Sequence, residues 1–387
     1  MVKGYDEKDL KRIEEALILL YDWYRNRGRK LPWRENPPVA YHVWLSEIML
    51  QQTRIEAVKP HYSAFLEEFP TIEALAAAEK DRVLKVWEGL GYYSRAVNLK
   101  AAAEVIVEEH GCKFPQSFDE IRALPGIGEY TAGAVSSICF EAPEPAVDGN
   151  VLRVLMRYLG REDNIAEPKV RKSVTEALRD LYRNRMYDLF RKNLFSFGCS
   201  NQALMELGEV ICIPNGTPLC AECPLRKAGC VAGENGTYTD IPVKAAKLKR
   251  EIQNRNVYLI FDDEHVLIRK RPESGLLAGM YEFPNEMAAD GSEVFRGLSG
   301  AGKKIRPEQV GEEKHIFSHI EWNLRVYAVD LRKNKHLSLS NVTTTIQQIQ
   351  GFEQCLPASF DQLTGEYAMP KAFTKLYKYL NISGDDL

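Results

Sequence analysis

A glutamate within an apolar stretch is the first residue whose setting suits catalysis. Glu47 lies in the segment VWLSEIMLQQT (43–53), where Trp44, Ile48 and Met49 are among its neighbours. Burial disfavours the charged form of a carboxyl group, so its pKa rises and it becomes a suitable general acid near neutral pH. A solvent-facing glutamate on an amphipathic helix is the simpler interpretation, and the segment alone leaves both open.

A glycine-rich turn between two apolar runs is the most specific segment. It reads LPGIGEYTAGAVSSI (124–138). Gly126 and Gly128 leave backbone N–H groups exposed at the start of a helix, which is a favourable place for a phosphate group. A plain corner between two helices would explain a lone Gly-x-Gly. The extended pattern, in which Tyr-Thr-Ala follows, is similar to the helix–hairpin–helix motif that binds DNA backbones.

An aspartate follows this turn after twenty residues. Asp148 opens the segment DGNVLRVLMR (148–157), where it stands at the expected start of a helix and would cap that helix. Helix N–H groups favour an ionised carboxylate, so a capping aspartate is also held rigidly and kept charged. At this distance from a helix–hairpin–helix, the sequence is similar to a superfamily of DNA glycosylases in which the aspartate is catalytic. The cap and the catalytic role are compatible.

Two further segments offer groups that could replace or read a base. WEGLGYYSRAVNL (87–99) presents Tyr92 and Tyr93 after a glycine turn, and aromatic rings can fill the gap that a displaced base leaves in DNA. FSHIEW (317–322) places a serine and a histidine beside aromatic residues at a turn. The simpler interpretation of the first segment is that both tyrosines pack in the core. The simpler interpretation of the second segment is an ordinary hairpin.

Four of the eight cysteines lie close together in CIPNGTPLCAECPLRKAGC (212–230). Their spacing, C-x7-C-x2-C-x6-C, suits a metal or iron–sulfur site more than disulfides in a reducing compartment. Four thiolates in a short loop can hold either a zinc ion or a cubane cluster. Arg226 and Lys227 lie between the last two cysteines, where the loop could present them to a phosphate group.

The elements that must position these residues differ along the chain. Residues 6–211 have helical periodicity broken by proline and glycine, which predicts an all-helical part with helices at 7–25 and 39–52. A turn-rich, basic stretch at 233–250 is expected to be a linker. The rest is expected to be α+β. Its predicted strands are 256–261, 265–269, 315–320 and 324–330, and its predicted helices are 343–350 and 370–380.

Composition narrows the class of protein. The 387 residues are 45% hydrophobic and 27% charged, which is typical of a globular protein with two domains. No apolar run reaches the ~18 residues of a membrane helix, and the N-terminus lacks the features of a secretory signal, so we expect a cytoplasmic protein. The formal net charge is −3, so binding to nucleic acid would depend on local patches and backbone donors.

Together these segments resemble the MutY-type adenine DNA glycosylases. LPWR (31–34) and the segments around Glu47, Tyr92, Gly126 and Asp148 occur in the order typical of that family, followed by the four cysteines. The resemblance implies a multidomain protein. Its parts would be an all-α helix–hairpin–helix glycosylase domain at 1–232 with an iron–sulfur loop at 212–230, a linker at 233–250, and an α+β Nudix-like domain at 251–387.

The resemblance also implies a function and site residues. The protein would be a monomeric bacterial enzyme of base excision repair that removes adenine mispaired with 8-oxoguanine or guanine in duplex DNA. Glu47 would protonate adenine at N7 and later activate water, and Asp148 would stabilise the oxocarbenium ion or form a covalent sugar intermediate, as in retaining glycoside hydrolysis. The other implied residues are Tyr130 and Asn150 to orient the carboxyl groups, Arg34 and Gln52 for the adenine pocket, Tyr92, Ser318 and His319 for the 8-oxoguanine, Gly126 and Gly128 for the DNA backbone, and Cys212, Cys220, Cys223 and Cys230 for a [4Fe–4S] cluster.

The sequence departs from the family pattern in two places. The family's usual cysteine spacing is x6, x2, x5, and this chain has one additional residue in the first and last gaps. The segment after Gly279 has Glu286 but no following Arg-Glu and Glu-Glu helix, so it lacks the Nudix hydrolase signature. We therefore expect this part to recognise a base and not to hydrolyse a pyrophosphate.

Two other functions fit parts of the sequence. An endonuclease III-like glycosylase/lyase needs an amine nucleophile, but position 152 is a leucine and the hairpin has Glu129 and Tyr130 where such enzymes carry a lysine. A non-catalytic damage-binding protein would need neither carboxyl group, whereas Glu47 and Asp148 are both present. Both alternatives are therefore weaker than an adenine glycosylase.

Overall fold

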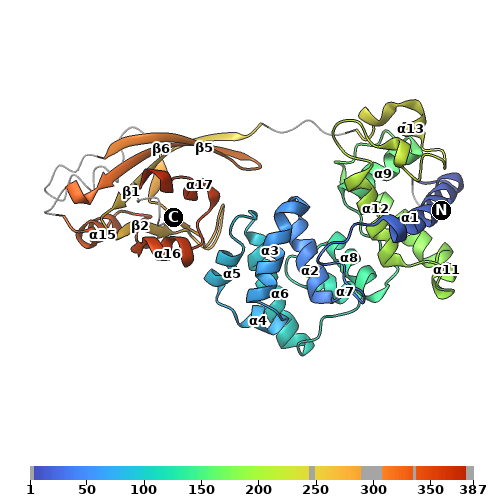
Figure 1. Cartoon of the computed structure of the whole chain (residues 1–387), viewed down its shortest axis with the longest axis horizontal. Helices are drawn as coiled ribbons and strands as arrows, with labels where there is room; N and C mark the ends of the chain where they lie inside the picture. Colours follow the sequence, from blue (N-terminus) through green and yellow to red (C-terminus); the bar gives the residue numbers. More distant parts are fainter. Residues whose placement is uncertain (1–3, 244–248, 289–306, 334–336, 381–387) are drawn as a thin grey trace. The chain divides into compact units, whose positions relative to one another are not determined.

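The structure is a computed structural model that describes residues 4–243, 249–288, 307–333 and 337–380. The described chain is helical up to the cysteine loop and contains a β-sheet after it (Figure 1). It forms two compact units. The first unit comprises 1–62, 71–76 and 101–246, and the second comprises 63–70, 77–100 and 247–387. No helix among the described residues is long and apolar enough to cross a membrane.

The N-terminal part is helical, as the periodicity predicts. Its first helix begins after Asp6, whose side chain accepts a hydrogen bond of 2.8 Å from the Asp9 N–H and so caps the helix. A π-helical turn, Leu181–Arg185, and two 3₁₀ turns, Cys220–Glu222 and Thr237–Thr239, interrupt the series. The helices are α1 (Glu7–Arg27), α2 (Ala40–Leu50), α3 (Ile55–Glu68), α4 (Ile72–Ala77), α5 (Lys80–Val86), α6 (Ser94–His110), α7 (Phe118–Ala123), α8 (Glu129–Phe140), α9 (Gly149–Leu159), α10 (Pro168–Asp180), α11 (Tyr187–Arg191), α12 (Phe197–Val210) and α13 (Val231–Asn235).

An apolar core of the first unit supports α9. Side chains of α1, α9, α10 and α12 meet there, and Ile13, Leu152, Leu178 and Leu204 are all fully buried. Each buried side chain of this size contributes ~1.5–3 kcal/mol relative to exposure. The N-terminal end of α9, where Asp148 lies, is therefore held by a well-packed helix.

Among its described residues, the second unit contains a mixed sheet of seven strands. The strand order is β3-β2-β1-β6-β5, β4 pairs with β1, and β7 pairs with β2. The long central pair, β1 with β6, is parallel, and the other pairs are antiparallel. The strands are β1 (Glu251–Phe261), β2 (His265–Lys270), β3 (Tyr281–Glu282), β4 (Asn285–Met287), β5 (Glu308–Ile316), β6 (Ile320–Asp330) and β7 (Cys355–Ser359), and the helices are α15 (Leu339–Gln347), α16 (Phe360–Gly365) and α17 (Lys371–Thr374).

Helices cover both faces of this sheet. Val257 and Leu259 of β1 pack in one core with side chains of α16 and α17, whereas Tyr258 and Ile260 pack in a second core with side chains of α15. Alternate residues of a strand point to opposite faces, so burial on both sides explains why β1 is apolar without alternation. The α+β prediction is confirmed.

Two predicted elements are wrong in detail. The predicted strand 315–320 contains a turn, because β5 ends at Ile316 and the Phe317 N–H donates to the Ile320 carbonyl oxygen at 2.8 Å. The polar residues Ser318 and His319 occupy that turn, between the end of β5 and the start of β6. The predicted helix 370–380 is α17 followed by the 3₁₀ turn Tyr377–Tyr379. Part of the predicted linker, 244–248, lies outside the described residues, and α13 extends into its start.

Candidate active site

A cavity of about 830 Å³ lies within the first unit. Its walls come from the loop before α2, from α2 itself, from the N-terminal ends of α8 and α9, and from α12. Seven residues that the sequence singles out line this cavity, although they are scattered along the chain. They are Arg34, Glu47, Gln52, Gly128, Tyr130, Asp148 and Asn150.

Glu47 is buried at the cavity wall. Only 8% of the residue is exposed, because α2 is enclosed on nearly every side by apolar packing. The Tyr130 hydroxyl donates a hydrogen bond of 2.7 Å to Glu47 Oε2. Burial raises the pKa of Glu47 to about 7 and the charge of Asp148 adds to the rise, while the Tyr130 hydrogen bond and Arg34 oppose it. The solvent-facing interpretation is therefore wrong, and Glu47 can hold a proton near neutral pH.

Asp148 caps α9, as its place in the sequence predicts. Its Oδ1 accepts from the Val151 N–H at 2.8 Å, and its Oδ2 accepts from Asn150 Nδ2 at 2.8 Å. Burial raises the pKa of Asp148, while these donors and the Arg153 guanidinium lower it. Glu47 accepts a single side-chain hydrogen bond by comparison. We infer that the proton of the pair resides on Glu47 and the negative charge on Asp148.

Arg153 is a site residue that the motifs did not reveal. Its Nη2 donates to Asn150 Oδ1 at 2.7 Å and to the Gly208 carbonyl oxygen at 2.8 Å, and its Nε donates to the Cys212 carbonyl oxygen at 2.8 Å. Only 5% of the residue is exposed. A Cβ atom on Gly208 would lie 2.5 Å from Asn150 Cβ, so glycine lets α12 approach α9 here. Arg153 thus connects the Asn150–Asp148 pair to the start of the cysteine loop.

The helix–hairpin–helix turn presents backbone at one edge of the cavity. Gly126 has φ of +73°, a conformation that favours glycine. Gly128 precedes α8, and a Cβ atom there would meet nothing within 4 Å. Packing within the chain therefore gives no reason for glycine at 128. The first N–H groups of α8 have no partner within the helix, so this end of α8 is a suitable place for a phosphate group.

The four cysteines of the loop, Cys212, Cys220, Cys223 and Cys230, are half-buried. Burial raises the pKa values of Cys223 and Cys230, and the neighbouring Cys212 adds to the rise, so these groups lie within electrostatic range of one another. Backbone N–H groups donate to Cys223 and Cys230, and Arg157 Nη1 lies 3.4 Å from Cys212 Sγ. Such donors are typical of thiolate sites. Within the described part of the chain, however, no three His, Cys, Asp or Glu side chains are arranged to hold a metal ion.

The remaining predicted residues lie together in the second unit. Ser318 and His319 are exposed in the loop between β5 and β6. The Tyr92 ring is 44% exposed, and its hydroxyl shares a hydrogen bond of 3.2 Å with the Ser318 hydroxyl. Tyr93 is buried, and its hydroxyl accepts from the Gly89 N–H. The core interpretation is thus correct for Tyr93 and wrong for Tyr92.

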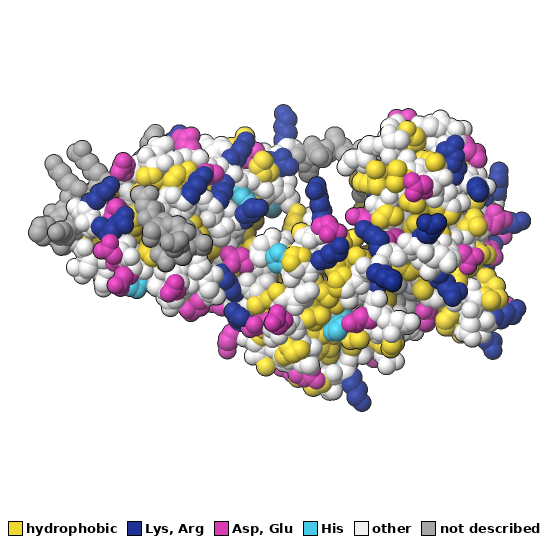
Figure 2. Space-filling model, in the orientation of Figure 1, with side chains coloured by type: hydrophobic (Ala, Val, Ile, Leu, Met, Phe, Trp, Pro, Cys, Tyr) yellow, Lys and Arg dark blue, Asp and Glu magenta, His cyan; other side chains and the backbone are white. Residues whose placement is uncertain are grey.

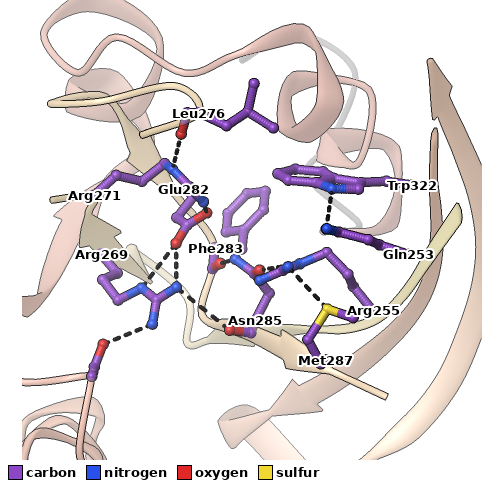
Figure 3. A network of polar contacts seen from close by, with 11 residues as sticks. Gln253, Arg255, Arg269, Arg271, Leu276, Glu282, Phe283, Asn285, Met287 and Trp322 are labelled. Atoms are coloured by element: carbon purple, nitrogen blue, oxygen red, sulfur yellow. Dashed lines mark hydrogen bonds and ion pairs between the residues drawn. The ribbon is translucent and has the colours of Figure 1, made fainter. Parts of the chain in front are cut away.

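An edge-to-face aromatic pair supports the loop that carries Ser318. The ring of Phe317 lies 4.8 Å from that of Trp322, and the Arg255 guanidinium lies 4.9 Å from the centre of the Trp322 ring. Trp322 Nε1 donates to Gln253 Oε1 at 2.9 Å (Figure 3). These contacts anchor the residue just before Ser318, so the loop has a defined position on the sheet.

A buried ion-pair network stabilises strands β2 and β3 of the same sheet. Glu282 of β3 is fully buried and pairs with both Arg269 and Arg271 (Figure 3). A buried carboxylate is tolerated only when it is paired and hydrogen-bonded. In the same unit, Asp81 of α5 accepts from Lys270 Nζ at 2.8 Å and from the Tyr281 hydroxyl at 3.0 Å. Strands β2 and β3 therefore take part in the ion pairs of Glu282, and they also contact α5 through Asp81.

Comparisons with known proteins agree with the fold. Residues 45–180 match the HhH-GPD superfamily of base excision DNA repair proteins, and residues 256–379 match the NUDIX domain. The class is thus a helix–hairpin–helix protein of base excision repair that binds DNA. The chain is 32% identical to the adenine DNA glycosylase of Schizosaccharomyces pombe over 84% of this chain and 83% of the relative. This chain belongs to the adenine DNA glycosylase family, and it is an enzyme that hydrolyses N-glycosyl bonds.

Other relatives show the same similarity. The human adenine DNA glycosylase is 31% identical over 84% of this chain and 68% of that protein. That of Buchnera aphidicola subsp. Schizaphis graminum is 34% identical over 69% of this chain and 74% of that protein. Among solved structures, a thermostable thymine-DNA glycosylase is 26% identical, with a TM-score of 0.48, over 59% of this chain and 98% of that chain.

The site geometry predicts how the excision rate depends on pH. A general acid works only in its protonated form, and the pKa of Glu47 is raised to about 7. With DNA saturating, the single-turnover rate should therefore be high below this pKa and fall as the pH rises through about 7. Quenched single-turnover assays between about pH 5.5 and 9 would measure this pH dependence. A rate that stays constant across this range would contradict the acid role of Glu47.

Proposed function

We propose that this enzyme excises adenine from A:8-oxoguanine and A:G mispairs, with Glu47 as acid and then base and with Asp148 as the group that stabilises the sugar cation. The supporting observation is the buried pair of carboxyl groups in one cavity, of which Glu47 has a raised pKa of about 7 and Asp148 is held by N–H donors. The names of the relatives support adenine as the base.

Protonation is the step that this pair makes possible. Adenine is a poor leaving group, so Glu47 transfers its proton to N7 before or as the glycosidic bond breaks. The electron pair of the C1′–N9 bond then leaves with the base, which departs as neutral adenine protonated at N7. The sugar is left as an oxocarbenium ion beside the negative charge of Asp148, which either stabilises it electrostatically or bonds to C1′.

The second half of the reaction returns the site to its first state. Glu47, now ionised, accepts a proton from a water molecule, and that water attacks C1′. The Tyr130 hydroxyl, 2.7 Å from Glu47 Oε2, holds the carboxyl group in place through both steps. Asn150 holds Asp148 in the same way at 2.8 Å. Arg34 and Gln52 line the cavity at positions from which they would contact the adenine.

Recognition of the mispair is assigned to the second unit and to the hairpin. Ser318 and His319 would read the added carbonyl and N–H of 8-oxoguanine, and Tyr92 would stack beside it. Gly126 and Gly128 would bind the DNA backbone. On the face drawn in Figure 2, basic side chains are interspersed with acidic ones, so backbone donors matter more for this enzyme than for a strongly basic one.

We further propose that Cys212, Cys220, Cys223 and Cys230 hold a [4Fe–4S] cluster. The four cysteines of one loop and the N–H donors toward Cys223 and Cys230 support this proposal. Bound there, it would supply a rigid cross-link for the loop. The Cys212 carbonyl oxygen that accepts from Arg153 would then be fixed in place. We also propose that the enzyme is monomeric, cytoplasmic and bacterial. Its domains would be 1–232 and 251–387, joined by a linker at 233–250.

A mispair panel tests the proposed reaction. Wild-type enzyme should release adenine from A:8-oxoguanine and A:G duplexes and leave T:G and thymine-glycol duplexes intact. Glu47→Gln should lower the single-turnover rate about 10²–10⁴-fold while still binding the mispair, because the amide has no acidic proton. Glu56→Gln is the matched control, since the Glu56 side chain is 80% exposed. A Glu47→Gln rate within a few-fold of wild type would refute the mechanism.

The role of the β5–β6 loop is tested by a ratio of rates. Ser318→Ala should lower the preference for A:8-oxoguanine over A:G by less than about tenfold, because one neutral hydrogen bond contributes on the order of 1 kcal/mol. Ser318→Ala with His319→Ala should lower it further. Ser340→Ala, at an exposed serine of α15, is the control. An unchanged ratio in the double variant would exclude the loop as the reader.

The cluster is tested by its metal content and colour. Purified enzyme should be brown and contain about four irons per chain. Cys220→Ser should lose iron, whereas Cys112→Ser should keep it, because Cys112 is an exposed cysteine in another part of the fold. A colourless enzyme with one zinc ion per chain would contradict the assignment.

A further inference from the structure

Glu206 of α12 is a carboxylate in the cavity wall that the proposed reaction does not use. Only 1% of the residue is exposed, and it binds two guanidinium groups. Its Oε1 accepts from Arg29 Nε at 2.7 Å and from the Arg29 backbone N–H at 3.0 Å. Its Oε2 accepts from Arg29 Nη2 at 3.0 Å and from Arg34 Nη2 at 2.9 Å. All three residues line the cavity.

Further contacts hold this cluster in one orientation. Arg34 Nη1 donates to the Arg29 carbonyl oxygen at 3.1 Å, and its guanidinium lies 5.2 Å from the centre of the Tyr24 ring. The Tyr24 hydroxyl donates to Gln202 Oε1 at 2.9 Å. Two cations share one anion here, so neither guanidinium can turn toward the cavity without losing a charged hydrogen bond.

Glu206 remains ionised throughout the working range of the enzyme. Its burial alone would raise its pKa, but hydrogen bonds and charge from Arg29 and Arg34 outweigh burial and lower the pKa to about 2. The cluster therefore carries one net positive charge, and it would carry two without Glu206.

This charge matters because the reaction creates positive charge in the same cavity. Protonated adenine and the sugar cation would both be repelled by a free guanidinium, and a free guanidinium also favours the ionised form of Glu47. Arg34 already lowers the pKa of Glu47. The charged and titratable groups that line the cavity with Glu47 or interact with it are Tyr24 of α1, Arg29, Arg34 and Glu35 before α2, Tyr130 and Cys139 of α8, Glu141 after α8, Asp148 before α9, Arg171 of α10, and Cys199, Glu206 and Glu209 of α12. Among them, Glu206 is the carboxylate bonded directly to Arg34.

We propose that Glu206 is a positioning residue that holds Arg29 and Arg34 against the cavity wall and neutralises part of their charge, so that Glu47 keeps its proton and the cavity accepts a cationic transition state. The inference rests on the proposed function, because it concerns the acid that starts the reaction. Glu206 touches neither the base nor the sugar in this role.

The test is the pH profile of single-turnover adenine release from an A:8-oxoguanine duplex. Glu206→Gln keeps the size of the side chain and removes its charge. The midpoint of the profile should shift to lower pH by about half a unit or more, so the rate should fall more at high pH than at low pH. Glu206→Asp keeps the charge and should keep the midpoint, even if the rate is lower. Glu209→Gln, at an exposed carboxylate of the same helix, should shift the midpoint much less.

Arg29→Met gives an independent arm if Glu206→Gln fails to fold. Removing one of the two guanidinium groups leaves Glu206 to Arg34 alone, so the midpoint should move to higher pH. A Glu206→Gln profile that is lower by the same factor at every pH, or an Arg29→Met midpoint that stays or falls, overturns the inference alone. A wild-type profile without any midpoint overturns the proposed function, and this inference with it.

Discussion

Two carboxyl groups in one buried cavity cannot both be ionised without a large electrostatic cost, and the site is built around this constraint. The chain resolves it by giving the two groups different donors. Asp148 has the N–H of Val151 and the amide of Asn150, whereas Glu47 has the hydroxyl of Tyr130. In the proposed mechanism, the result is one acid and one anion in the same cavity, which is the pair that hydrolysis of a glycosidic bond requires.

The fold serves this pair by fixing helix ends and not by fixing loops. Asp148 is set by the start of α9, whose apolar face lies in the core of the first unit. Arg153, one turn into α9, extends this rigidity to the cysteine loop through the Cys212 carbonyl oxygen. Glu206 does the same on α12 for Arg29 and Arg34. Arg153 and Glu206 are thus charged residues within α9 and α12 that hold other polar groups of the cavity in place.

Local motifs indicated Glu47 and Asp148, and the family resemblance added Tyr130, Asn150, Arg34 and Gln52, but neither indicated the residues that support them. Glu47 and Asp148 could be found because their neighbours in sequence already show burial or a helix start. Arg29 and Glu206 could not, because they are separated by 177 residues and only the fold brings them together. Arg153 reads as one more polar residue of an amphipathic helix. The strand predicted at 315–320 failed for another reason, since the polar pair Ser318 and His319 marks a tight turn between Phe317 and Ile320 and the strand prediction ran across it.

The central claim is that Glu47 holds a proton at neutral pH while Asp148 does not. Carbon-13 NMR of enzyme labelled at glutamate and aspartate carboxyl carbons measures this directly, with Glu47→Gln and Asp148→Asn spectra to assign the two signals. The account predicts that Glu47 titrates near pH 7 and that Asp148, which accepts from two N–H donors, titrates at lower pH. A Glu47 signal that titrates near the ordinary glutamate pKa of about 4.3 would contradict it. An Asp148 signal that titrates at higher pH than the Glu47 signal would contradict it as well.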